Sequence, residues 1–155
     1  MEIIARNRLL TFSPSGGGTT LAVRLGSTAT GSGSDGKLFR NQAPDNITGL
    51  WVVLRLIDLP VTGFDGGFML KGTFEAIAYG RPRNQQAAVE SCVDVMMEAW
   101  HDYAYTESGG HFSTFDPTGR FPIPYVSDPA DRELVAVRVL LPFRCAPIFL
   151  TRYAA

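Results

Sequence analysis

The chain has 155 residues, of which 45% are hydrophobic and 19% charged, and its formal net charge is −1. This size and composition are typical of one globular domain that buries a sizeable core, and they exclude an intrinsically disordered chain. Because the net charge is close to zero, the sequence offers no general surface for polyanions. Nucleic acid is therefore not favoured as the primary partner.

The basic residues are unevenly divided, with twelve Arg and two Lys among the fourteen. Arg is favoured in buried and interfacial ion pairs because its planar guanidinium can bind a carboxylate through two hydrogen bonds. A biased genome composition would produce the same excess, so the Arg count fits either explanation.

No stretch approaches the roughly 20 consecutive apolar residues of a membrane-spanning helix, and the first residues lack the pattern of a signal peptide. Cys92 and Cys145 each lie within an apolar stretch, so both are predicted to be small, reduced core residues. We therefore expect a protein that is made in, and stays in, a cytoplasm-like compartment.

The first quarter of the chain gives weak signals. Residues 2–12 are compatible with a strand or with one or two helical turns. Residues 13–36 are two-thirds Gly, Ser and Thr, which predicts a flexible loop or an arm toward a partner, with a short strand at 20–25. A second short strand is expected at 37–40.

The strongest pattern is a strand, a hairpin turn and a second strand. Residues 50–57 form an apolar run rich in β-branched and aromatic side chains, and residues 68–79 are predicted to continue as a second strand. Between them, Phe64-Asp65-Gly66-Gly67 contains the Asp-Gly and Gly-Gly pairs that tight hairpin turns favour. Residues 80–83 end the second strand.

A helix over residues 85–103, with Asn84 as its N-cap, has the clearest periodicity in the chain. Its apolar positions recur at helical spacing and share one side: Val89, Cys92, Val93, Met96, Trp100 and Tyr103. The opposite side is acidic: Glu90, Asp94, Glu98 and Asp102. Because no Lys or Arg offsets these charges on the helix, they form either a solvated surface or one that meets basic residues of a neighbouring subunit.

Residues 104–131 are rich in proline and aromatic residues and are predicted to form a second long loop. Its aromatic side chains would form either a contact surface or a cap over one end of the core. The last strand is predicted at 133–144, where alternate residues from Val135 to Phe143 are apolar. Pro142 indicates a sheet edge or the end of that strand.

One glycine-rich segment resembles a nucleotide-binding motif. Residues 31–36 satisfy G-x-G-x-x-G, and together with Lys37 they approach a Walker loop. Both sites need a helix whose N-terminus holds the phosphates, whereas Pro44 and Gly49 leave no room for one. Leu38 also replaces the Ser or Thr that would bind magnesium. A Gly/Ser linker explains the match, and no cofactor is predicted.

The two histidines, His101 and His111, have Asp102, Glu107 and Asp116 nearby in sequence and can be considered as metal ligands. No H-x-x-x-H motif or cysteine pair fixes a coordination geometry, so surface histidines are expected and no metal site is predicted. The chain also lacks G-x-S-x-G, and neither cysteine has a neighbouring His. No catalytic residue is therefore predicted, and the chain is not expected to be an enzyme.

These elements predict a single α+β domain over residues 1–155, with a small antiparallel or mixed sheet packed against one main amphipathic helix. The strand at 50–58, Gly66-Gly67-Phe68 opening a second strand, Tyr79-Gly80-Arg81 and a Gln/Ala-rich helix ending in an aromatic residue follow one another. This order resembles the tail terminator (tail completion) proteins of long-tailed bacteriophages. The similarity covers roughly residues 37–103, and the strand at 133–144 continues it.

The resemblance implies a virion protein without catalytic residues that forms a ring, usually a hexamer, at the head-proximal end of the tail tube. Such a ring stops tube growth and joins the tail to the head. The implied partners are other copies of the chain, the tail tube protein and the head–tail connector protein, with genomic DNA only passing through the lumen and no membrane. Assembly would take place in the host cytoplasm. The Gly/Ser-rich residues 13–36 depart from the short N-terminal region expected of the family.

By analogy, we place contact with the tube on the hairpin 59–67, which includes Phe64 and Asp65. Contact with the neighbouring subunit is placed on the acidic helix side and on the turn after the second strand: Glu90, Asp94, Glu98, Asp102, Arg81 and Arg83. Two alternatives remain open. One is another head–tail connector, neck or baseplate component, and the other is a small cytoplasmic enzyme or ligand-binding domain that uses residues 112–125 as a lid.

Overall fold

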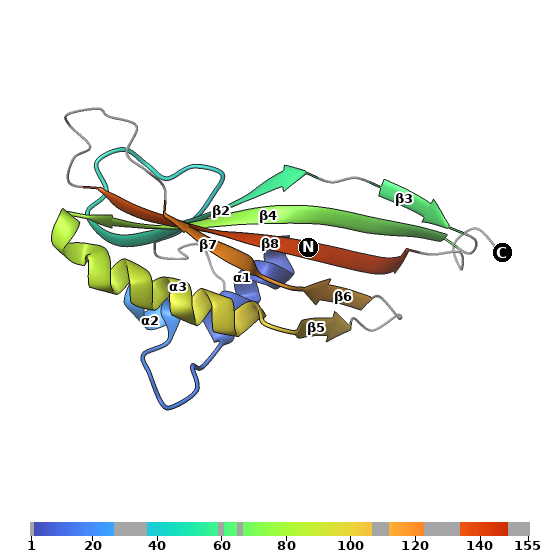
Figure 1. Cartoon of the computed structure of the whole chain (residues 1–155), viewed down its shortest axis with the longest axis horizontal. Helices are drawn as coiled ribbons and strands as arrows, with labels where there is room; N and C mark the ends of the chain where they lie inside the picture. The colour runs from blue at the N-terminus through green and yellow to red at the C-terminus, as the bar shows by residue number, and fades with distance from the viewer. Residues whose placement is uncertain are drawn as a thin grey trace.

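The computed structural model of the chain describes residues 2–26, 37–58, 61–64, 67–106, 112–122 and 134–148. In these residues the protein is a mixed α/β domain, in which a curled sheet of eight strands carries helices on one face (Figure 1). Each helix in these ranges is too short or too polar to span a bilayer. The α+β class expected from the sequence is confirmed.

The described strands all belong to one mixed sheet. They are β1 (Leu38–Arg40), β2 (Gly49–Asp58), β3 (Val61–Phe64), β4 (Gly67–Arg81), β5 (Tyr103–Thr106), β6 (Phe112–Phe115), β7 (Thr118–Pro122) and β8 (Val135–Ile148). Their order is β1-β2-β4-β8-β6-β5, with β3 added on β4 and β7 on β8. β1 runs parallel to β2, and the other pairs are antiparallel.

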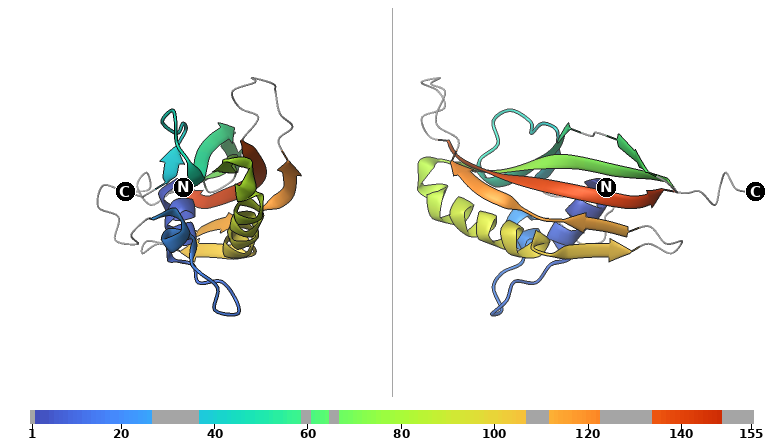
Figure 2. Two further views of the ribbon diagram at one scale, coloured as in Figure 1. Left: turned by 90° about the vertical axis from the view of Figure 1, so that its left-hand side faces the viewer. Right: turned by 45° about the vertical axis from the view of Figure 1, so that its right-hand side comes forward.

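Three α-helices of the described chain lie on the same face of this sheet (Figures 1 and 2). They are α1 (Glu2–Thr11), α2 (Leu21–Leu25) and α3 (Gln86–Trp100), and the 3-10 turn η1 (Arg83–Gln85) leads into α3. β4 and β8 pair from Gly80↔Val135 to Phe68↔Ile148. These two strands continue past the end of α3, so part of the sheet projects beyond the helices (Figure 1).

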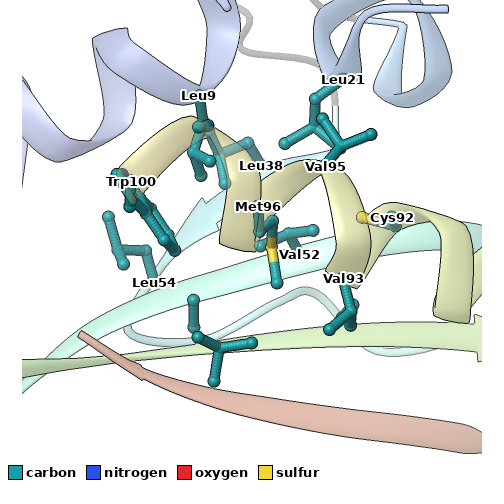
Figure 3. Packing of buried hydrophobic residues seen from close by; sticks show 14 of the residues in the cluster. Leu9, Leu21, Leu38, Val52, Leu54, Cys92, Val93, Val95, Met96 and Trp100 are labelled. Carbon is teal, nitrogen blue, oxygen red and sulfur yellow. The ribbon is translucent and has the colours of Figure 1, made fainter. Parts of the chain in front are cut away.

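The core lies between the sheet and the helices, and α3 contributes much of it (Figure 3). Five of the apolar positions that the helical spacing predicts are completely buried: Val89, Cys92, Val93, Met96 and Trp100. Trp100 Nε1 donates a hydrogen bond to the carbonyl oxygen of Ala5 over 3.1 Å, which joins α3 to α1. On the sheet, Phe74 stacks on Phe143 with ring centroids 4.8 Å apart.

Gly72 of β4 lies where two strands and an aromatic ring leave no room for a side chain. A Cβ atom at this position would lie 2.5 Å from Cζ of Phe143 and 2.7 Å from the carbonyl oxygen of Asp58. Phe143 cannot easily move because it stacks on Phe74. We expect Gly72→Ala to lower the free energy of unfolding by about 1–3 kcal/mol, measured by urea denaturation.

Gly18→Ala is the matched control for Gly72→Ala. A Cβ atom at Gly18 would meet only Pro14, at 3.7 Å. This is an ordinary contact, so we expect a change in stability within about 0.5 kcal/mol. Equal effects of the two substitutions would contradict the packing argument at Gly72.

The two predicted strands are present as β2 and β4, and a further strand that was not predicted, β3, lies between them. β2 pairs with β4 from Gly49↔Arg81 to Asp58↔Thr73, with an irregularity after Leu56. β3 pairs with the start of β4, with Phe64 opposite Gly67. The short strand expected at 37–40 is also present, as β1.

The short strand predicted at 20–25 is wrong, because these residues form helix α2. The hydroxyl of Thr20 accepts a hydrogen bond from the backbone N–H of Val23 over 3.4 Å, and Gly26 closes the helix with a left-handed φ of 67°. The helix buries Leu21 and Leu25 on the core. Residues 2–12, which the sequence left open, are helical in α1.

The bounds predicted for the main helix also need correction. α3 ends at Trp100 rather than at Tyr103, because Asp102 adopts a left-handed φ of 50° and Tyr103 begins β5. Asn84 is not the N-cap, since it lies inside η1 and the residue before α3 is Gln85, whose side chain makes no capping hydrogen bond. Tyr103 instead stacks on Phe115, with ring centroids 5.9 Å apart.

The loop predicted at 104–131 contains strands in its described part. β5, β6 and β7 lie there, and β6 and β7 both pair with β8. Each is four or five residues long, so each gives a weak sequence signal. β6 and β7 also depend on the distant β8 for hydrogen bonds. Phe115 is buried in the core, whereas Tyr105 is exposed. The explanation that the aromatic residues cap the core therefore holds for Phe115.

Pro142 does not mark an edge or an end, because β8 continues to Ile148 between β4 and β6. The strand tolerates the proline for a local reason. Pro142 lies opposite the break between β6 and β7, where its carbonyl oxygen accepts a hydrogen bond from the N–H of Asp116 over 3.2 Å. The N–H that proline lacks would point to the same side as its carbonyl, where the ladder is already interrupted.

Candidate functional site

The face of the sheet opposite the helices, which we call the outer face, carries the most distinctive polar chemistry of the described chain. The alternation of side chains along β2, β4 and β8 defines it, since Phe74 and Leu141 point into the core and their neighbours point away. Its central side chains are Trp51, Val53, Arg55, Thr73, Glu75, Ile77, Tyr79, Arg81, Arg138, Leu140 and Pro142.

An ion-pair cluster of Arg55, Glu75 and Arg138 lies in the middle of the outer face. Arg55 is directly opposite Glu75 in the β2–β4 register, and its Nε and Nη2 donate to the two carboxylate oxygens over 3.0 and 3.2 Å. Nη1 of Arg138 lies 4.0 Å from the same carboxylate. Glu75 is only 4% exposed, whereas the side chains of Arg55 and Arg138 are 50% and 40% exposed. The cluster therefore buries one carboxylate beneath two accessible guanidinium groups.

We expect Arg55→Leu to lower the free energy of unfolding by about 2 kcal/mol, because Glu75 would keep only the distant Arg138 as its partner. Loss of one partner from a buried pair costs more than this, but Arg55 is half-exposed, which reduces the effect. The measurement is urea denaturation at pH 7. Adding Glu75→Leu to Arg55→Leu removes the buried charge and should restore most of the stability. Equal stability of the two variants would contradict this role for Arg55.

Beside this cluster, residues 41–47 lie over the outer face near Trp51 and Arg81 and line a hollow of about 710 Å³. Its floor is the stacked pair Trp51 and Tyr79, with ring centroids 5.3 Å apart, and the guanidinium of Arg81 lies 5.9 Å from the Trp51 ring. Burial raises the pKa of Tyr79, partly offset by the charge of Arg55. The predicted contact residue Arg81 is therefore held on the outer face.

A second hollow, of about 530 Å³, lies further along β4 and β8, near Lys71 and Arg144. Lys71 and Arg144 are directly opposite each other in the β4–β8 register, and both are exposed. Like charges in this position repel. Asp58 and Asp116 line the same hollow and place two carboxylates near them.

The acidic side chains predicted on the helix are not all equivalent. Asp94 is exposed and Glu90 is partly exposed on α3. Glu98 is engaged within the chain, because Ser15 donates to it from both its backbone N–H, over 2.9 Å, and its hydroxyl. Asp102 lies beyond the helix, in the exposed turn before β5.

Two hydrogen bonds from Ser15 lower the pKa of Glu98. The one from the hydroxyl has the larger effect, and the one from the backbone N–H has the smaller. Because the pKa of Glu98 is lower in the folded protein, its ionised carboxylate stabilises the fold at pH values above the ordinary Glu pKa of roughly 4.3. This contribution is lost as the pH falls through the folded-state pKa. We expect Ser15→Ala to move the pKa of Glu98 upward, measured by NMR titration of the side-chain carboxyl carbon. An unchanged titration curve would contradict the hydroxyl's role, and Ser91→Ala is a control on the same helix.

The remaining predicted contact residues are described only in part. Arg83 is in η1 and Phe64 ends β3, but the placement of their side chains is not described. Asp65 falls outside the described residues. The structure therefore groups Arg81 with the outer face and Glu90 with Asp94 on α3, on opposite sides of the sheet (Figure 2).

Three of the residues considered as metal ligands come together in the structure. The ligand atoms of His101, Asp102 and Asp116 lie within 4.8 Å of one another, and all three residues are exposed. Nε2 of His101 is 3.4 Å from Oδ2 of Asp102. Exposed groups of this kind occur widely without a metal, and none of these is held by a buried partner in the described chain, so we assign no metal site. His111 and Glu107 fall outside the described residues.

The glycine-rich residues 31–36 also fall outside the described residues, but the chain after them is described. Lys37 is followed by strand β1 rather than by a helix, and its Nζ donates to the carbonyl oxygen of Thr48 over 2.7 Å. The helix that a dinucleotide or Walker site requires is therefore missing from residues 37–58.

Cys92 and Cys145 are free thiols and both are buried, as predicted. Burial raises the pKa of Cys92 to about 12, so its thiol is protonated at neutral pH and unsuited to nucleophilic attack.

No model of a protein family matches the chain, and no curated protein matches it. Function must therefore be argued from the outer face, from α3 and from the order of the elements.

Sequence reasoning missed the Arg55–Glu75–Arg138 cluster. The signal was present, because Arg55 and Glu75 each interrupt an apolar strand. Such interruptions in a strand buried on one face mark either the solvent side or a paired charge. The pairing itself depends on strand register, which the sequence does not supply.

Proposed function

We propose that the chain is a structural subunit of a long-tailed bacteriophage, a tail terminator that forms a ring at the head-proximal end of the tail tube. The ring stops tube growth and joins the tail to the head connector. The observation that carries the proposal is the order of elements. The strand–hairpin–strand–helix pattern that resembles the terminator family is realised as β2, β3, β4 and α3 in one continuous unit.

The shape of the sheet supports an assembly role. β4 and β8 project beyond the helices, with β3 on β4 at the far end (Figure 1). At this end β2 continues past the last residue paired with β1, which is Leu54, and it exposes Leu56 and Ile57. Apolar side chains on a projecting strand suit contact with another protein. We assign this end, with Phe64 and Asp65, to contact with the tail tube.

The chemistry of the described residues also favours assembly over catalysis. The two hollows are open and are lined by charged groups that are already paired or exposed. The alternative that a specific observation favours is a ligand-binding domain, because the hollow beside Trp51 and Tyr79 combines an aromatic floor with Arg81. Another neck or baseplate component would share the features that support a terminator.

The test is electron microscopy of particles from a phage that carries this gene with a nonsense codon. Headless tails of uncontrolled length would support the terminator. Tails of normal length beside unjoined heads would replace it with a head–tail connector. Intact, infectious particles would overturn the structural role and favour the ligand-binding alternative.

A further inference from the structure

The hollow beside Trp51 contains a hydrogen-bond donor that the fold itself does not use. Trp51 is only 6% exposed, yet its indole N–H has no hydrogen-bond partner in the described chain and is not sealed from solvent. Buried indole N–H groups usually find a partner. Because Trp51 lines the hollow of about 710 Å³, its N–H opens into that space.

Tyr79 supplies a second donor to the same hollow. It stacks on Trp51 across β2 and β4, with ring centroids 5.3 Å apart, and its hydroxyl has no hydrogen-bond partner among the described residues. Burial raises the pKa of Tyr79, so the hydroxyl keeps its proton at neutral pH and can donate. The stacked pair therefore presents two donors to a bound group.

The wall of the hollow that residues 41–47 form is also polar. Asn41, Gln42 and Asn46 are exposed there, and their side-chain amides have no hydrogen-bond partner in the part of the chain that the structure describes. Each amide can both donate and accept, as a peptide backbone does. Val53 and Ile77 line the hollow beside the stacked pair, and they make this part of it apolar.

The hollow does not call for an anionic ligand, because the two arginines that line it already have interactions within the chain. Arg55 donates to Glu75 over 3.0 Å, and the guanidinium of Arg81 lies 5.9 Å from the Trp51 ring. The indole N–H can donate but cannot accept. The group that faces it is therefore an acceptor, and a neutral carbonyl oxygen fits this position.

A peptide that contains proline matches this pattern of donors. Proline has a carbonyl but no N–H, so it brings an acceptor and no donor that would be left unpaired against the indole. In the polyproline II conformation the backbone makes no internal hydrogen bonds, and its carbonyls remain available to a partner. The pyrrolidine ring also supplies apolar surface for the part of the hollow beside Val53 and Ile77.

We propose that the hollow lined by Trp51, Tyr79 and residues 41–47 binds an extended, proline-containing segment of a partner protein, whose backbone carbonyls accept hydrogen bonds from Trp51 and Tyr79. Aromatic-lined grooves bind proline-rich segments in this manner, and the stiff segment loses little entropy on binding. The amides of residues 41–47 then pair with the remaining peptide groups. The site does not depend on the terminator role proposed above.

The first experiment is an NMR titration of the isotope-labelled full chain with an uncharged proline decamer, acetylated and amidated at its ends. The chain has two tryptophans, so the spectrum contains two indole N–H signals, and Trp51→Phe identifies the one from Trp51. We expect the peptide to shift the Trp51 signal and to leave that of Trp100, whose N–H is bonded to Ala5.

The control peptide is an alternating Gly-Ser decamer with the same end groups, which has as many carbonyls but keeps every N–H and has no ring. It should leave both indole signals in place. An unmoved Trp51 signal up to the solubility limit of the proline peptide would overturn the proposal, and so would an equal shift with the control peptide.

The second experiment is the same titration with Tyr79→Phe, which keeps the ring against Trp51 and removes the hydroxyl. We expect the dissociation constant of the proline peptide to rise about three- to tenfold, the effect of one lost hydrogen bond. The matched control is Tyr103→Phe, on the core side of the sheet, where Tyr103 stacks on Phe115. Urea denaturation verifies that both variants are folded. Unchanged binding by Tyr79→Phe, or equal weakening by Tyr103→Phe, would overturn the proposed site.

The peptide site and the terminator role fail in different ways. If the nonsense mutant makes tails of uncontrolled length but the proline peptide leaves the Trp51 signal unmoved, the site is wrong and the terminator stands. If the Trp51 signal responds while the nonsense mutant makes normal particles, the site stands and the terminator is wrong.

Discussion

Trp100→Ala should destabilise the domain by about 3–5 kcal/mol, the largest effect on stability that we expect from a single substitution in this chain. Trp100 is completely buried at the end of α3 and is among the largest of the fully buried side chains. Its removal loses the transfer free energy of the indole and leaves a cavity between α1, α3 and the sheet. It also leaves the carbonyl oxygen of Ala5 without its donor. Because the free energy of unfolding of a domain of this kind is about 5–15 kcal/mol, the variant would keep only a small margin of stability.

The measurement for Trp100→Ala is urea denaturation followed by far-ultraviolet circular dichroism, which does not depend on the tryptophan signal. Trp100→Phe is the matched control, because it keeps most of the apolar volume and loses the N–H donor. We expect it to cost about 1–2 kcal/mol. Equal midpoints for Trp100→Ala and wild type would show that α1 does not depend on this side chain.

The long elements could be predicted from the sequence because their signal is local. The apolar period of α3 and the largely apolar stretches of β2 and β4 each extend over ten or more residues. Burial against a core enforces such periods, since a slip of one residue in a strand would move every side chain to the other face. The alternation from Val135 to Phe143 in β8 follows the same rule.

The short elements could not be predicted because their signal is not local. Residues 21–25 read as a strand by composition, and only the pairing of Thr20 and Gly26 as caps marks them as helix α2. β6 and β7 pair with β8, which lies later in the chain, and β5 joins the sheet only through β6. The same holds for the outer face, where Arg55, Glu75 and Arg138 meet only because β2, β4 and β8 are neighbours in register.

If the chain forms the proposed terminator ring, reversing the charges of Arg81 and Arg83 together should abolish its assembly on tail tubes. Arg81 ends β4 on the outer face, where its guanidinium lies over Trp51. Glu at this position would reverse the charge of the turn to which the proposed subunit contact is assigned, and it would remove the cation–π contact. Glu at position 83, two residues on, would add a second negative charge to the same turn. Across an interface, like charges cost several kcal/mol, which is enough to abolish a weak contact.

The measurement for Arg81→Glu with Arg83→Glu is electron microscopy of purified tail tubes mixed with the variant, counting tubes with a ring at one end. Arg81→Lys with Arg83→Lys keeps both charges and should retain rings, although the planar guanidinium of Arg81 near the Trp51 ring is lost. Urea denaturation of both variants separates a failure to fold from a failure to assemble. Normal rings from the folded Glu variant would remove this turn from the interface. Rings lost in the Lys variant as well would mean that the guanidinium of Arg81, rather than its charge alone, governs the subunit contact.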